Sequence, residues 1–162
     1  FVIFLIGTLA ISGIPPFAGF FSKDEILAHA FEHSPFLWGI TLVAALMTTF
    51  YMFRLLFLTF FGSFRGTEHQ RSHLHESPLV MTIPLMILAL LSAIGGFIGI
   101  PKVLGGHNFL GQFLSPVIYS HGAEHLLTEE MIHLERLLMG VSTGAVIVTI
   151  IITWFVYVNI EN

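Results

Sequence analysis

Long apolar stretches with few charges dominate the pattern of hydrophobic and polar positions along this chain. They cover residues 1–31, 36–61, 78–100 and 137–160. Each is long enough for a helix that crosses a bilayer core, which takes about 20 apolar residues. Polar loops separate them, a short one over 62–77 and a longer one over 101–136. The pattern predicts an all-α, polytopic membrane bundle of four transmembrane helices in a single membrane domain.

The first apolar segment contains an interruption near its middle. Gly13, Pro15, Pro16 and Gly19 fall close together there. Proline lacks a backbone N–H and clashes with the preceding helical turn, so we expect the helix to open near Gly13 and to restart after Pro16. Irregular backbone at this depth is tolerated only against protein or a wet cavity. The sequence therefore predicts a broken, discontinuous first helix.

A lysine follows this interruption. If the outer end of the segment lies near His33, Lys23 is about 15 Å inside it at the helical rise of about 1.5 Å per residue, which is the bilayer midplane. A lysine there costs about 2.5–3.5 kcal/mol, so we expect it to face the bundle interior or a hydrated path. The alternatives are a snorkelling lysine or a segment that ends earlier. Asp24 is a candidate charge partner, although adjacent helical residues diverge by about 100° and need not pair.

Composition narrows the function classes. Hydrophobic residues make up 55% of the 162 positions and charged residues 10%, and the mean hydropathy is +0.87. The net charge of −4 leaves no basic surface for a nucleic acid. Cysteine is absent, which excludes iron–sulfur ligation by thiolates, and no dinucleotide-binding motif occurs. We expect no cofactor on this chain. Because Phe1 begins inside an apolar run, we also expect a piece of a longer polytopic protein.

Basic residues predict the orientation. Arg65 and Arg71 lie in the short loop, and Arg54 lies just before it. The positive-inside rule therefore places the short loop in the cytoplasm and the longer loop outside. At the end of the longer loop, the apolar spacing after Thr128 predicts amphipathic helical turns that run directly into the last membrane segment.

Histidines form a candidate metal cluster in the short loop. His69 and His73 have the i, i+4 spacing of zinc ligands on a helix, and His75 lies nearby. A closed zinc site needs a fourth ligand and supporting hydrogen bonds, which the loop does not supply. We therefore predict loop histidines at a subunit interface and no metal site.

Two glycines mark one face of the last segment. Gly140 and Gly144 have the G-x-x-x-G spacing that lets a second helix approach closely in a membrane. Such pairs also occur by accident, and the sequence leaves both interpretations open.

Three runs of sequence carry a family resemblance. Residues 7–27, GTLAISGIPPFAGFFSKDEIL, resemble the broken twelfth helix of the chain L (mitochondrial subunit 5) type of respiratory complex I. Residues 47–54, MTTFYMFR, resemble the next helix, and the stretch from His75 to Gly96 resembles the one after it. The last apolar segment matches loosely, and the longer loop hardly at all.

The resemblance implies the C-terminal part of an antiporter-like, proton-translocating subunit of NADH:quinone oxidoreductase in the inner cell membrane. Lys23 would act as a proton relay in a chain of mid-membrane ionisable residues. The implied partners are the other membrane and peripheral subunits, the lipid bilayer and protons. NADH, FMN, iron–sulfur clusters and quinone would belong to partner subunits. Large subunits of cation/proton antiporters and membrane-bound hydrogenases share the broken helix and remain alternatives. A purely structural membrane anchor is a further alternative.

Overall fold

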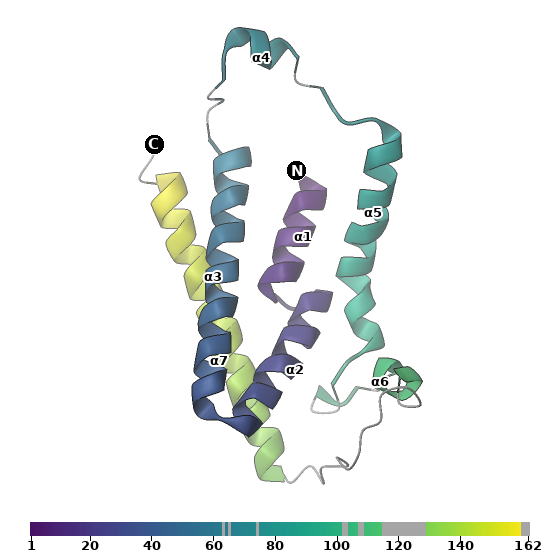
Figure 1. Cartoon of the computed structure of the whole chain (residues 1–162), viewed down its shortest axis with the longest axis vertical. Helices are drawn as coiled ribbons and strands as arrows, with labels where there is room; N and C mark the ends of the chain where they lie inside the picture. Colours follow the sequence, from purple (N-terminus) through teal and green to yellow (C-terminus); the bar gives the residue numbers. More distant parts are fainter. Residues whose placement is uncertain are drawn as a thin grey trace.

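The computed structural model of the chain is a bundle of helices (Figure 1). It describes residues 1–62, 64, 66–73, 75–101, 104–106, 109–114 and 129–159. In chain order the elements are α1 Val2–Ser12, α2 Ala18–His33, α3 Pro35–Phe60, α4 Glu68–Ser72, α5 Leu79–Ile94, the 3₁₀ turn η1 Gly95–Ile98, α6 Phe109–Leu114, α7 Glu129–Trp154 and the π-helical turn η3 Phe155–Asn159. The described residues form no β-strand, so the predicted all-α class is confirmed.

Three stretches among the described residues are long and apolar enough to cross a membrane. They are Pro35–Phe60, Leu79–Ile98 and Ile132–Val158. The helix α1 has 11 residues and is too short to cross alone, but α1 and α2 follow one another through the bundle as two halves of one crossing (Figure 1). The described chain therefore has the features of a multi-pass membrane protein with a broken first helix, as the sequence predicts.

The crossings alternate in direction. The halves α1 and α2 run from the end where the N-terminus lies to the α2–α3 turn, and α3 returns (Figure 1). At this turn the hydroxyl of Ser34 accepts a hydrogen bond from the N–H of Phe36, and Pro35 occupies the first helical position, where no donor is needed. The short helix α4 lies at the end of the N-terminus, and α6 lies at the opposite end (Figure 1).

The last crossing begins earlier than its apolar segment. A single helix, α7, runs without interruption from Glu129, where the sequence predicts amphipathic turns, to Trp154. Thr128, which directly precedes these predicted turns, lies outside the described residues, as does Arg65 of the short loop.

Aromatic and aliphatic side chains on α3 form the centre of the bundle. Phe53, Leu56 and Phe57 are buried there, and side chains from α1 and from the α7–η3 segment pack against them. On the other side of α1, α5 covers the broken helix, and η1 continues from it against α2. A Cβ on Gly96 would lie 2.6 Å from the ring of Phe21, so only glycine lets η1 approach α2 this closely. The broken helix therefore lies between α3, α7 and the α5–η1 segment, with part of its surface exposed.

Candidate functional site

A Schellman motif ends the first half of the broken helix. The N–H of Gly13 donates to the carbonyl of Ala10 over 3.1 Å, and the N–H of Ile14 donates to the carbonyl of Leu9 over 3.2 Å. This motif needs a left-handed residue at its turn, and Gly13 supplies it with φ of 78°. The two prolines that follow prevent the helix from continuing.

The second half of the broken helix begins in direct contact with the first. Gly19, the second residue of α2, lies against the backbone of Ala10, and a Cβ at this position would overlap the Ala10 carbonyl oxygen. The end of α1 and the start of α2 therefore approach as closely as their backbones allow. This contact fixes the direction in which the side chains of the next turn of α2 point.

Lys23 fills a hydrogen-bonding position that the break creates. In an uninterrupted helix the carbonyl of Ile11 would accept from the N–H of residue 15, but residue 15 is a proline. The ammonium Nζ of Lys23 donates to this carbonyl instead, over 2.8 Å. The negative end of the α1 dipole also favours a cation here. Gly13 leaves room for the lysine stem, because a Cβ on Gly13 would lie 3.0 Å from Lys23 Cδ.

Asp24 has a different partner, on a distant part of the chain. Its side chain is buried, with 8% of the residue exposed, and its Oδ1 accepts a hydrogen bond of 3.0 Å from the hydroxyl of Ser142 on α7. Its second oxygen, Oδ2, has no hydrogen-bond partner among the described residues. Lys23 and Asp24 make no ion pair in the described part of the chain, as the angular argument from the sequence allowed.

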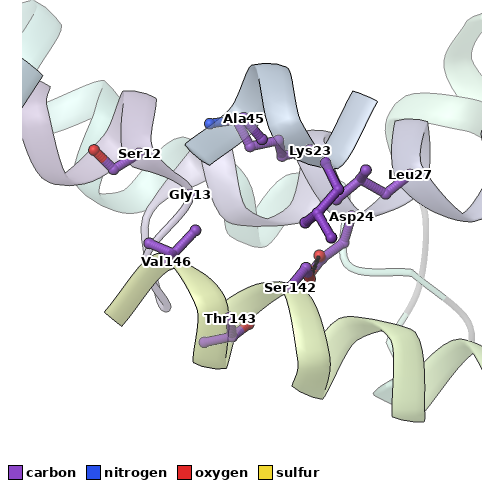
Figure 2. Close-up of a pocket in the computed structure, with 10 residues that line it drawn as sticks. Ser12, Gly13, Lys23, Asp24, Leu27, Ala45, Ser142, Thr143 and Val146 are labelled. Carbon is purple, nitrogen blue, oxygen red and sulfur yellow. Dashed lines mark hydrogen bonds between the residues drawn. The ribbon is translucent and has the colours of Figure 1, made fainter. Parts of the chain in front are cut away.

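Both side chains line one small pocket in the bundle. Figure 2 shows them leaving α2 in different directions, with Asp24 pointing at Ser142. The lining residues are Ser12, Gly13, Lys23, Asp24, Leu27, Leu42, Ala45, Ser142, Thr143 and Val146. The space open to a water molecule is about 10 Å³, close to the roughly 10–15 Å³ that one bound water needs and too small for an organic ligand. The pocket therefore suits protons and water better than an organic ligand.

The histidines of the short loop do not complete a metal site in the described residues. The rings of His69 and His73 lie 4.7 Å apart, and His75 is exposed. Within the described part of the chain, no three His, Cys, Asp or Glu side chains are placed to hold a metal ion.

Two other features that the sequence analysis singled out, Arg54 and the G-x-x-x-G pair, lie away from the pocket. The guanidinium of Arg54 lies 5.5 Å from the ring centroid of Tyr157, in a cation–π contact. Gly140 and Gly144 are exposed on α7, and a Cβ on either would meet nothing within 4 Å. The G-x-x-x-G pair therefore makes no close helix contact within the described chain.

Two partners of the site were missed from the sequence. The carbonyl of Ile11 could have been found, because Pro15 four positions later removes its helical donor. Ser142 could not, because 118 positions separate it from Asp24 and no local pattern distinguishes it from other hydroxyl residues of the last segment.

Comparisons with known proteins extend the resemblance beyond these motifs. A family profile described as NADH:quinone oxidoreductase/Mrp antiporter, TM, matches residues 1–43. The chain is 46% identical to NAD(P)H-quinone oxidoreductase chain 5 of Picosynechococcus sp. over 96% of its length, and 51% identical to the chloroplastic subunit 5 of Chaetosphaeridium globosum over 64%. It is 39% identical to NADH-quinone oxidoreductase subunit L of Rhodobacter capsulatus over 77% of its length. The matches cover 25%, 16% and 18% of these three relatives.

Proposed function

Because the chain belongs to the family of chain 5 and subunit L of NAD(P)H-quinone oxidoreductases, we propose that it forms part of a proton-translocating membrane subunit of such an enzyme. It spans about a quarter or less of the relatives' length, so we assign only part of the proton path to it. Lys23 is the residue that takes up and releases the proton. Asp24 lines the same pocket and acts on Lys23 through its charge, without an ion pair.

The observation that carries this proposal is the hydrogen bond from Lys23 to the carbonyl of Ile11. Lys23 is held by a backbone carbonyl, no carboxylate among the described residues is in direct contact with its ammonium, and the side chain is half-buried. The carbonyl and the helix dipole favour the protonated amine. After proton release the neutral amine is attracted less strongly, so the side chain is held less firmly against Ile11. The charge on Lys23 thus sets how strongly the lysine binds the end of α1.

The remaining steps of the reaction belong to other subunits. A quinone reductase needs electron carriers and an NAD(P)H site, and we propose that both lie on partner subunits. This chain contributes the enclosed proton site between α1, α2, α3 and α7. Lipid surrounds the exposed apolar side chains that no other subunit covers. Electron transfer then drives proton movement by changing the charge or hydration near Lys23.

Two alternatives predict different behaviour. A cation/proton antiporter subunit would use the same broken helix, and the profile description names both classes. The relatives described above are all quinone oxidoreductase subunits, which favours coupling to electron transfer. A structural anchor does not need a lysine beside a helix break, because a neutral residue would be cheaper to bury in the membrane.

The test replaces Lys23 in the full-length subunit of an assembled complex. Lys23→Met removes the charge, and Lys23→Arg keeps a charge that is not released in proteins. We expect both variants to assemble, as judged on native gels, and both to lower the number of protons moved per NAD(P)H oxidised in sealed vesicles. Glu25→Gln is the matched control, because Glu25 is exposed and does not line the pocket. A Lys23→Arg complex with the wild-type ratio would refute the proton-relay role.

A further inference from the structure

Ser142 differs from other hydroxyl residues of α7. The hydroxyls of Thr149 and Thr153 donate to carbonyls of their own helix, those of Ala145 and Thr149. Ser142 reaches across to another helix, where its Oγ lies 3.0 Å from Asp24 Oδ1. It is 5% exposed, so water does not compete freely for this hydrogen bond. Ser142 is the described residue that ties the carboxyl group of Asp24 to α7.

The same hydroxyl has a second acceptor on its own helix. Ser142 Oγ also lies 3.0 Å from the carbonyl oxygen of Met139. A hydroxyl has one hydrogen to donate and two lone pairs with which to accept. When Asp24 is ionised, Ser142 donates to the carboxylate, because a charge-assisted hydrogen bond is the stronger of the two. When Asp24 is protonated, the acid can donate to Ser142 Oγ, and Ser142 can turn its hydrogen to Met139. The hydrogen bond between Asp24 Oδ1 and Ser142 can therefore persist in both charge states of Asp24, with the carboxyl group in one place.

We propose that Ser142 is a positioning residue that holds Asp24 away from Lys23, whether the carboxyl group of Asp24 is ionised or protonated. The inference rests on the proton-relay role proposed above for Lys23. The two side chains are adjacent in sequence and line one pocket, yet Lys23 is bonded to Ile11 and Asp24 to Ser142. Without Ser142, no described side chain would hold the carboxylate toward α7. It would turn to the ammonium and form a charge-assisted hydrogen bond that retains the proton on Lys23.

The expected effect follows from the strength of the lost contact. A hydrogen bond to a charged group changes an equilibrium by roughly ten-fold or more. Ser142→Ala should therefore favour the position of Asp24 that contacts Lys23 by about this factor. Proton release from Lys23 should slow by a similar factor. Ser142→Thr keeps the hydroxyl and should retain most of the wild-type rate.

The experiment measures the initial rate of proton movement per assembled complex in sealed vesicles, with each substitution in the full-length subunit. We expect Ser142→Ala to be roughly ten-fold slower than wild type at an unchanged amount of complex on native gels. Thr149→Ala is the matched control, because it removes a hydroxyl from the same helix that bonds only to the carbonyl of Ala145 among the described residues. A wild-type rate for Ser142→Ala, or an equal loss in Thr149→Ala, would overturn the proposal.

A double-mutant cycle separates positioning from packing. In an Asp24→Asn background the carboxylate that could bind Lys23 is absent, so Ser142→Ala should cause no further loss. If Ser142→Ala slows proton movement by the same factor with and without Asp24→Asn, Ser142 acts by packing and the proposal is overturned. The same conclusion would follow if Ser142→Thr assembled normally but was as slow as Ser142→Ala.

Failure of the positioning role of Ser142 can be distinguished from failure of the proton-relay role of Lys23. If Lys23→Met and Lys23→Arg move protons normally, the proposed function itself is wrong. If those variants are impaired while Ser142→Ala is not, Lys23 keeps its role and only the positioning role of Ser142 is refuted.

Discussion

The contact between Gly19 and Ala10 predicts that a single methyl group will weaken the broken helix. In Gly19→Ala the new Cβ would overlap the Ala10 carbonyl oxygen. That oxygen belongs to the backbone of α1, so no side-chain rotation can relieve the overlap. The start of α2 must move away from the end of α1, which disturbs the hydrogen bond from Lys23 to the neighbouring carbonyl of Ile11.

The magnitude can be worked from two opposing effects. Adding a methyl group to a tightly packed site costs about 1–3 kcal/mol, and a backbone neighbour places the cost near the upper end. Alanine is a better helix former than glycine by about 1 kcal/mol in a helix interior, and by less at the first turn. We therefore expect Gly19→Ala to lower the free energy of unfolding by about 2 kcal/mol.

A second glycine of the same broken helix provides the matched control. A Cβ on Gly7 of α1 would meet nothing within 4 Å, so Gly7→Ala adds a methyl group without a clash. It should stabilise α1 by about 0.5–1 kcal/mol through helix propensity. The two substitutions are chemically identical and should have opposite effects.

The assay heats membranes that contain the full-length subunit and follows the assembled complex on native gels, together with proton movement at a permissive temperature. Gly19→Ala should lose the complex at a lower temperature than wild type and should move protons more slowly, whereas Gly7→Ala should do neither. Equal heat resistance and equal proton movement in the two variants would refute the argument that the backbone contact at Gly19 shapes the site.

Three further predictions concern residues outside the pocket. In an otherwise cysteine-free full-length subunit, Ser72→Cys should react with a membrane-impermeant reagent only from the cytoplasmic side and Glu129→Cys only from the outside; the reverse pattern would refute the predicted orientation. Tyr157→Leu should lower stability by about 0.5–1 kcal/mol through loss of the cation–π contact, measured by the same heating assay, while Tyr157→Phe should retain it. His69→Ala combined with His73→Ala should leave the metal content of the purified complex unchanged by elemental analysis, and a loss of bound zinc would contradict this.

Local properties of the chain account for what the sequence predicts well. The lengths of apolar stretches give the crossings, and the position of Gly13 and the two prolines gives the break, because a proline acts on the turn beside it. The divergence of adjacent helical residues likewise predicts that Lys23 and Asp24 need not pair. Each of these inferences needs only residues within a few positions of one another.

Contacts between distant segments account for what the sequence does not reveal. The hydrogen bond from Ser142 to Asp24 depends on how α7 packs against α2, and the tight fit of Gly96 depends on how η1 approaches Phe21. Neither residue belongs to a short motif with a known chemistry. A serine in an apolar helix most often bonds to its own backbone, as Thr149 does, so composition alone gave no reason to select Ser142.

The helix break and Lys23 depend on one another through the carbonyl of Ile11. Pro15 deprives the carbonyl of Ile11 of its helical donor, and a backbone carbonyl without a partner is unfavourable inside a membrane. Lys23, in the second turn of α2, supplies that donor while it is bonded to Ile11. The protonated amine thus stabilises the broken helix, and the break stabilises the protonated amine. Because release of the proton weakens both, a change of charge at Lys23 is coupled to the fit between α1 and α2.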